Sequence, residues 1–202
     1  MSSLSIPTVI LSVSAFLLAS RIIIKRSAQI PAAARTAIVE TLDACLFAAL
    51  LSLVIITFVV QAFYIPSGSM EPTLMIDDRI LVAKFLYRFE PVHRGDVIVF
   101  RYPLNPQRDF VKRVIGLPGD RVQLKDGVVY VGGQPISEKG YTIKPDFGNY
   151  GPVTVPGRDF FVLGDNRNNS EDSRFFGYVP RGNIIGKAVF IYWPPQRLGF
   201  VQ

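Results

Sequence analysis

Residues 44–75 read ACLFAALLSLVIITFVVQAFYIPSGSMEPTLM, and this stretch joins a segment suited to lipid directly to a polar one. Its first half carries no charged side chain, and its apolar character continues to Ile65. A bilayer core requires about 20 apolar residues in helical form. We therefore expect a transmembrane helix over residues 44–64. Two serines, Ser67 and Ser69, follow immediately where the chain would enter water.

Another uncharged apolar segment lies near the start of the chain, at residues 4–20. A cleavable signal peptide would place its positive charge before such a segment. Here the basic residues follow it instead, at Arg21, Lys25, Arg26 and Arg35. We therefore expect residues 1–24 to form a retained membrane anchor rather than a leader that is removed.

The basic residues between the two apolar segments predict how the chain is oriented in the membrane. Short loops rich in lysine and arginine stay on the cytoplasmic side. Residues 25–43 are therefore expected to form a cytoplasmic basic loop, and residues 65–202 an extracytoplasmic domain. The protein would then be an integral membrane protein in contact with membrane lipid.

Composition argues against several other classes of protein. The net charge of +6 is not gathered into a basic block of the kind that binds nucleic acid, so we expect no nucleic-acid partner. The single cysteine, Cys45, lies inside the second apolar segment, and the single histidine is His93. These counts exclude a disulfide and a Cys/His metal cluster, and we expect neither metal nor cofactor.

The rest of the chain shows the pattern of strands and turns. Asp126-Gly127 separates two alternating segments, which is a strong hairpin signal. Residues 140–157, rich in glycine and proline, are expected to form a long loop. The sequence predicts a mainly β, antiparallel-sheet domain preceded by two transmembrane α-helices. The expected strands are short apolar runs bounded by turn residues, at 78–85, 95–100, 109–117, 121–131, 158–164 and 184–193.

If Ser69 is a nucleophile, it requires a base to take its proton. His93 lies in the turn PVHRGD, where a surface histidine is the simpler interpretation. Lysine is the other common partner of a catalytic serine. A lysine can act as a base near neutrality only if its pKa falls by about 3 units from ~10.4, and burial lowers it in this way.

Lys112 is the best candidate for such a buried lysine. In DFVKRVIG, the period-2 alternation of a strand places Phe110, Lys112 and Val114 on one face. Lys84, in VAKFL, is the second candidate. From the pattern alone, a lysine that extends its amine to water from a half-exposed strand is the commoner outcome.

The residues around Ser69 suit a nucleophile. Pro66 and Pro72 stiffen the chain on either side, and Gly68 allows the backbone to approach a substrate closely. The hydroxyl of Ser67 could add a donor for an oxyanion. An ordinary turn at the end of a membrane segment has the same composition, so this stretch alone does not decide between the two.

Taken together, the chain resembles the type I signal peptidases, the membrane-bound serine proteases that remove signal peptides from exported preproteins. The resemblance implies a mainly β fold with a Ser-Lys dyad, and preprotein signal peptides as substrate. A lysine as base implies the bacterial or organellar type, in a bacterial plasma membrane or a thylakoid-type membrane. Four motifs in order carry the resemblance: PSGSMEPTL (66–74), RGDVIVF (94–100), VKRVIGLPGD (111–120) and GDNRNNSEDSR (164–174).

The resemblance also implies roles for individual residues. Ser69 would be the nucleophile and Lys112 the general base. Ser67 would donate to the oxyanion, and Ser170 would hydrogen-bond and orient the lysine amine. Asn168 departs from the family, where aspartate is common, so one bracing ion pair is in doubt. The implied bracing residues are Asp165, Asp172 and Arg174, and the implied walls of a pocket for small substrate residues are Ile65, Met70 and Val111.

Two other functions are weighed against this one. Self-cleaving repressors share a Ser-Lys site, but they lack membrane anchors and carry a DNA-binding helix-turn-helix that is absent here. A membrane-anchored, non-enzymatic β domain for binding or assembly is the second alternative. A serine-acylating inhibitor separates it from a peptidase, because a binding module should not react at Ser69.

Overall fold

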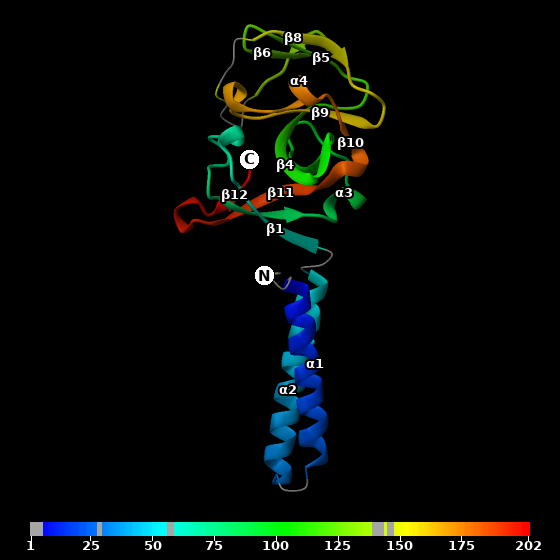
Figure 1. Ribbon diagram of the computed structural model, residues 1–202, viewed down its shortest axis with the longest axis vertical. Helices are drawn as coiled ribbons and strands as arrows, with labels where there is room; N and C mark the ends of the chain where they lie inside the picture. The colour runs from blue at the N-terminus through cyan, green and yellow to red at the C-terminus, as the bar shows by residue number, and fades with distance from the viewer. Residues whose placement is uncertain (1–5, 28–29, 56–58, 139–143, 145–147) are drawn as a thin grey trace. The chain divides into compact units, whose positions relative to one another are not determined.

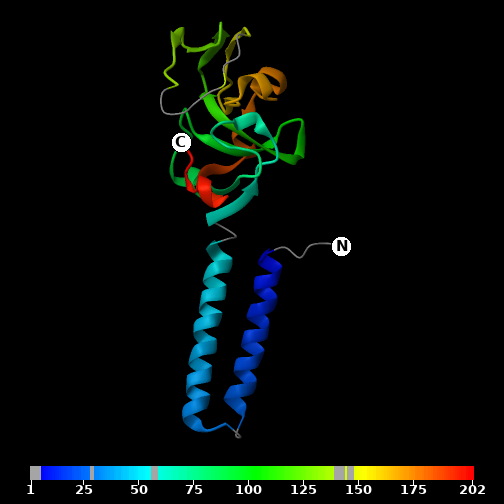
Figure 2. The same ribbon diagram turned by 90° about the vertical axis from the view of Figure 1, so that its left-hand side faces the viewer.

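A computed structural model gives the structure of the protein. The chain divides into two compact units, Met1–Val60 and Gln61–Gln202. Figures 1 and 2 show the first as a pair of helices and the second as a body built mainly of strands. The structure describes residues 6–27, 30–55, 59–138, 144 and 148–202.

The helices of the first unit, α1 (Ile6–Arg26) and α2 (Ala32–Val54), lie side by side in both views. Each is long and apolar enough to cross a membrane. Their large apolar side chains point outward, with Phe16 exposed by 71% and Phe47 by 69%. A helix that is apolar all round suits lipid as its solvent. An ion pair between Arg21 and Asp43 links the two helices.

The second helix has different bounds from the predicted anchor. α2 begins at Ala32, so residues 32–43 of the predicted loop 25–43 are helical. This part, AAARTAIVETLD, is rich in helix formers, and extending a helix costs far less than starting one. At its other end α2 stops at Val54, and Val60–Tyr64 form strand β1 instead of the end of the predicted helix. Hydrophobic periodicity does not distinguish a helix from a strand in an apolar run as short as Val60–Tyr64.

The described strands of the second unit form two sheets, which confirms the predicted antiparallel β domain. The larger sheet has the order β1-β2-β11-β3-β4-β9-β10, with β12 on β11, and the smaller has the order β7-β6-β5-β8. In Figure 1 the smaller sheet lies at the top. The remaining bounds are β2 Arg79–Ala83, β3 Val97–Tyr102, β4 Asn105–Gly116, β5 Arg121–Lys125, β6 Val128–Val131, β7 Gln134–Pro135, β8 Tyr150–Thr154, β9 Asp159–Leu163, β10 Val179–Pro180, β11 Ile184–Trp193 and β12 Gly199–Phe200.

Short helical turns connect these strands. Among the described residues, two are single α-helical turns and four are 3-10 turns. One of the 3-10 turns carries Ser69, so the predicted nucleophile lies on a tight turn and not on a strand. The bounds are α3 Leu86–Phe89, α4 Ser173–Phe176, η2 Gly68–Met70, η3 Arg167–Asn169, η4 Arg181–Asn183 and η5 Pro195–Arg197.

The predicted hairpin at Asp126-Gly127 is confirmed. Both residues have positive φ, 49° and 80°, as a two-residue type I′ turn requires. The predicted loop 140–157 is wrong over Tyr150–Thr154, which form β8 beside β5. Glycine and proline lower the strand propensity of these residues. Pairing with the neighbouring strand β5 stabilises the strand in spite of this low propensity. Residues 140–143 and 145–147 of that loop lie outside the described residues.

Strand β4 lies in the interior of the larger sheet. It pairs with β3, where Ile98 faces Lys112, and with β9, where Leu163 faces Arg113. Because neighbouring strands flank its second half on both sides, side chains there are buried even when they are charged. This placement decides the environment of Lys112.

Candidate active site

The turn that carries Ser69 is held in place by backbone hydrogen bonds. The amide of Asn166 donates to the carbonyl of Ser69 over 3.1 Å, and the Asn166 side chain donates to the carbonyl of Gly68 over 3.0 Å. Ahead of the turn, the amide of Ile65 donates to the carbonyl of Asp78 over 2.9 Å. Ser69 is thus fixed from two directions, and its side chain is largely buried. Sequence reasoning did not single out Asn166, which is 97 residues from Ser69 in the chain.

Lys112 and Ser69 lie in direct contact. Lys112 Nζ is 2.8 Å from Ser69 Oγ, within hydrogen-bond distance, and 3.0 Å from the carbonyl oxygen of Val111. The lysine is only 4% exposed, and its amine lies 5.3 Å from the centre of the Phe110 ring. The alternative of a lysine whose amine reaches water is therefore wrong for Lys112.

Burial changes the acid–base behaviour of this amine. Desolvation penalises the ammonium form and lowers the pKa of Lys112 from 10.5 to about 8, although the carboxylates of Asp172, Glu171 and Asp165 oppose the change. The amine is therefore neutral in a useful fraction of molecules near neutral pH. A neutral amine at 2.8 Å can accept the hydroxyl proton of Ser69.

A buried ion pair involves Arg113, the residue that follows Lys112 in the chain. Asp165 and Arg113 are exposed by 0% and 1%, and they form two hydrogen bonds of 2.8 and 2.6 Å. Thr73 Oγ1 donates to Asp165 over 2.5 Å, which ties the end of the Ser69 motif to the same carboxylate. Sequence reasoning missed Arg113. Its signal was an arginine inside the apolar strand VKRVIG, where a buried guanidinium requires a carboxylate partner.

A second ion pair, predicted as bracing, joins Asp172 and Arg174. Their two side-chain hydrogen bonds measure 2.8 and 2.9 Å, and Asp172 also accepts from the backbone amide of Arg174 at the start of α4. Arg174 donates in addition to the carbonyl of Arg167 over 2.7 Å. Arg167 itself is buried and paired with Glu138, next to the exposed Asn168.

Ser170 lies in a crowded part of the site. Its Oγ is buried and forms no hydrogen bond within the described part of the chain, so its predicted bond to the Lys112 amine is not formed in this structure. Gly164 packs against it so closely that an added Cβ would lie 2.2 Å from Ser170 Oγ and 2.5 Å from the Ser69 carbonyl oxygen. Only glycine fits at that position without displacing the nucleophile's backbone.

A cleft of about 490 Å³ opens over the two residues. Ser67, Ser69, Val111 and Lys112 line it, so the predicted oxyanion donor, nucleophile, pocket wall and general base meet at one surface. Of the predicted pocket walls, Ile65 and Met70 are 2% and 0% exposed and pack with Val111 in one apolar cluster. In this structure only Val111 faces the cleft. The other lining residues are Pro66, Arg108, Asp109, Phe110, Asn169 and Glu171.

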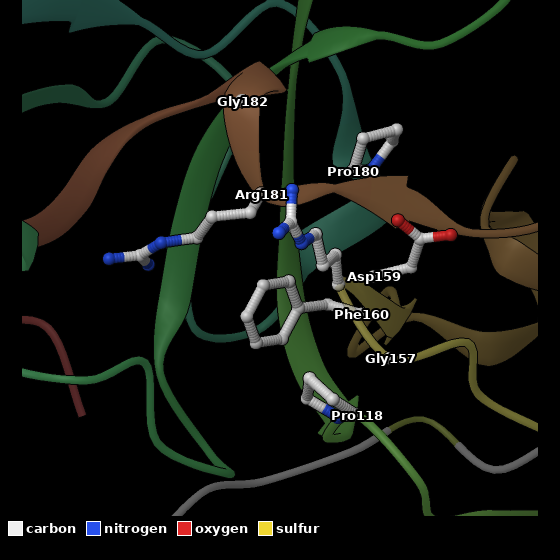
Figure 3. A pocket seen from close by; sticks show the side chains of 8 residues that line it. Pro118, Gly157, Asp159, Phe160, Pro180, Arg181 and Gly182 are labelled. Atoms are coloured by element: carbon white, nitrogen blue, oxygen red, sulfur yellow. The ribbon is translucent and has the colours of Figure 1, made fainter.

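The two rejected bases lie elsewhere. His93 precedes β3, and its backbone amide donates to Asp96 over 2.9 Å. Lys84 follows the end of β2, and neither residue lines the cleft. A larger hollow of about 700 Å³ lies between β9 and η4 (Figure 3), with Arg158, Asp159 and Phe160 among its walls. It contains neither serine nor lysine, so volume alone does not mark the site.

The Arg113–Asp165 pair is expected to dominate the local stability. Asp165→Ala leaves a guanidinium buried without its counter-charge, which should cost about 3–5 kcal/mol in the free energy of unfolding. Urea titration followed by the fluorescence of Trp193, the single tryptophan, measures this. Lys144→Ala is the matched control: it breaks the exposed Lys144–Glu71 pair and should cost at most ~1 kcal/mol. Equal losses in both variants would contradict the assigned role of Asp165.

A serine hydroxyl in contact with a buried lysine on a β domain is typical of the Ser-Lys class of serine peptidases. Comparison with known proteins agrees. The family described as "Signal peptidase, peptidase S26" matches residues 38–193. The chain belongs to this family, which confirms the resemblance and gives no support to a non-enzymatic β domain.

Individual relatives show how far the similarity extends. A signal peptidase I of Leptolyngbya laminosa is 54% identical over 157 residues, which cover 74% of this chain and 76% of the relative. A probable signal peptidase I-2 of Synechocystis is 46% identical over 159 residues, covering 76% and 72%. A solved signal peptidase I from Enterococcus faecalis is 33% identical, covers 48% of this chain and 97% of its own, and has a TM-score of 0.41.

Proposed function

We propose that this protein is a membrane-anchored serine endopeptidase that removes N-terminal signal peptides from exported preproteins. The contact between Ser69 Oγ and Lys112 Nζ carries the proposal, because it places a nucleophile against a buried amine of lowered pKa. Membership of the signal peptidase family supplies the substrate class. The helices α1 and α2 anchor the chain, with the catalytic unit on the extracytoplasmic face of a bacterial plasma or thylakoid-type membrane.

The reaction follows from the geometry. Ser69 Oγ attacks the scissile carbonyl carbon while Lys112 Nζ takes the hydroxyl proton. The Ser67 hydroxyl and the Ser69 backbone N–H stabilise the negative charge on the carbonyl oxygen. When the C–N bond breaks, the Lys112 ammonium gives its proton to the leaving amine of the mature protein. The signal peptide remains as an ester on Ser69.

A water molecule then resolves this acyl-enzyme. Lys112, neutral again, takes a proton from the water, and the resulting hydroxide attacks the ester carbonyl. Collapse of the second tetrahedral intermediate returns the proton to Ser69 Oγ and releases the signal peptide with a free carboxylate. Lys112 thus serves as base and acid in both acylation and deacylation. The surrounding loops are held in place by Asp165, Asp172 and Arg174.

Val111, which lines the cleft, is proposed to form a wall of the pocket for small residues at positions −3 and −1 of the substrate, with Ile65 and Met70 packed behind it. A preprotein chain would add to the domain as an extended strand. The cut bond must lie close to the lipid surface, and only three residues lie between Ile65, where the apolar stretch ends, and Ser69.

Cleavage of a purified model preprotein tests the proposal. The full chain in detergent should release a signal peptide by cutting after the small residue at −1, as mass spectrometry of both products shows. A preprotein with phenylalanine at −1 is the matched control and should remain intact. If both substrates are cut equally, or neither is cut, the proposed activity is wrong.

The pH dependence of cleavage reports on Lys112. With a pKa of about 8, roughly one tenth of the amines are neutral at pH 7, so kcat/KM should rise about tenfold per pH unit well below pH 8, about fivefold between pH 7 and 8, and level off above it. The rise follows deprotonation because the neutral amine is the active form. A profile that is flat from pH 6 to 9 would show that Lys112 is not the base.

A further inference from the structure

An arginine shares the strand face of the catalytic lysine. Arg108, Phe110 and Lys112 alternate along β4, and all three line the cleft. The Arg108 guanidinium lies 5.2 Å from the centre of the Phe110 ring and 5.8 Å from that of Tyr102. The two rings stack at 4.4 Å with an angle of 10° between them. Arg108 therefore rests on a rigid aromatic platform at the edge of the active site.

Arg108 forms no ion pair within the described ranges, and its side chain is exposed. Two carboxylates, those of Glu171 and Asp109, line the same cleft. Glu171 accepts a hydrogen bond of 2.5 Å from the Tyr102 hydroxyl. Asp109 also lines the cleft and lies opposite Arg101 in the register of β3 and β4, without an ion pair to Arg108. The donors of Arg108 thus remain available to a bound molecule.

We propose that Arg108 is a specificity-determining residue that binds the carboxylate of an acidic residue in the preprotein. This rests on the proposed function. A guanidinium held on aromatic rings loses little freedom when it forms a bidentate pair with a carboxylate. Arg108 comes four positions before Lys112, and this offset corresponds to about 13 Å along a strand that rises ~3.3 Å per residue. A substrate that adds as a strand has the same spacing, so the acidic residue lies roughly three to five residues from the scissile bond.

A peptide carboxylate is favoured over a lipid phosphate because Arg108 lines the same cleft as Ser69 and Lys112. A cation that served only to attract anionic lipid would not need a place on the strand face that carries the base. Binding of a peptide carboxylate and binding of a lipid phosphate lead to different expected results, because only binding of the peptide carboxylate depends on the sequence of the substrate.

The test uses model preproteins that differ at one residue, with glutamate, glutamine or lysine placed in turn at positions −5 to +5. With the wild-type chain in detergent, glutamate should raise kcat/KM about five- to tenfold over glutamine at one position in the stated window. Arg108→Gln should reduce this ratio to about one, and Arg108→Glu should invert it in favour of lysine. Arg108→Lys should keep part of the preference.

Arg158→Gln is the matched control, because Arg158 is also exposed but lines the separate hollow between β9 and η4. It should leave the glutamate-to-glutamine ratio unchanged. A wild-type ratio of one at every position, or a ratio that survives Arg108→Gln, overturns the proposal while cleavage of the glutamine substrate still supports the peptidase activity. A loss in Arg108→Gln that is independent of substrate charge but varies with anionic lipid assigns Arg108 to the membrane instead.

Discussion

Replacing Ser69 by alanine is expected to abolish cleavage of a model preprotein, with a loss of about 10⁶-fold in kcat. The substitution removes the single atom that forms the covalent intermediate and leaves the side chain of Lys112 in place. The loss is measured as the rate of signal-peptide release at pH 8, with protein folding checked by circular dichroism. Residual cleavage near the wild-type rate would show that another nucleophile acts.

Ser67→Ala is the matched control for this variant, since it removes a hydroxyl two residues away. Loss of one oxyanion donor should lower kcat by about 10²–10³-fold and leave KM nearly unchanged. A serine-acylating inhibitor should add its mass to the Ser67→Ala protein and not to Ser69→Ala. If both variants were labelled, the reactive serine would lie elsewhere in the chain.

Lys112→Arg is expected to lower the rate of cleavage by about 10⁴-fold, the upper range for loss of a general base. The positive charge is kept, but a guanidinium does not give up its proton at any pH that the protein tolerates. Activity should therefore not recover on raising the pH to 10, whereas the wild-type rate stays at its plateau. The measurement is initial rate against pH for the two proteins.

Lys84→Arg provides the matched control, because Lys84 was the second candidate for the base and does not line the cleft. It should retain close to the wild-type rate and pH profile. If Lys84→Arg loses activity and Lys112→Arg does not, the roles of the two lysines are reversed, and the contact between Lys112 and Ser69 has another purpose.

Much of the fold could be predicted because its signals are local. Short apolar runs bounded by turn residues located six strand segments, and the hairpin at Asp126-Gly127 was predicted from residue type. The predictions were wrong where a local signal was ambiguous. The apolar run through Val60–Tyr64 suits a helix or a strand, and the strand at Tyr150–Thr154 is formed from residues that favour loops. In both cases a neighbouring strand decided the outcome.

The candidate site was predictable only in part. Motif order pointed to Ser69 and Lys112, but their burial and mutual distance depend on which strands flank β4. Arg113 was missed because an arginine in a strand is normally exposed, and its buried partner Asp165 is 52 residues away. Arg108 gave no sequence signal, since its aromatic platform requires the pairing of β3 with β4.

The amino-acid sequence by itself determined the two apolar helices, the antiparallel strands and the residue types available for catalysis, because each depends on neighbours within a few positions. Only the tertiary structure decided that the Lys112 amine loses contact with water and lies 2.8 Å from the Ser69 hydroxyl. Desolvation and close contact arise from elements distant in the chain, and they convert an ordinary lysine into a base.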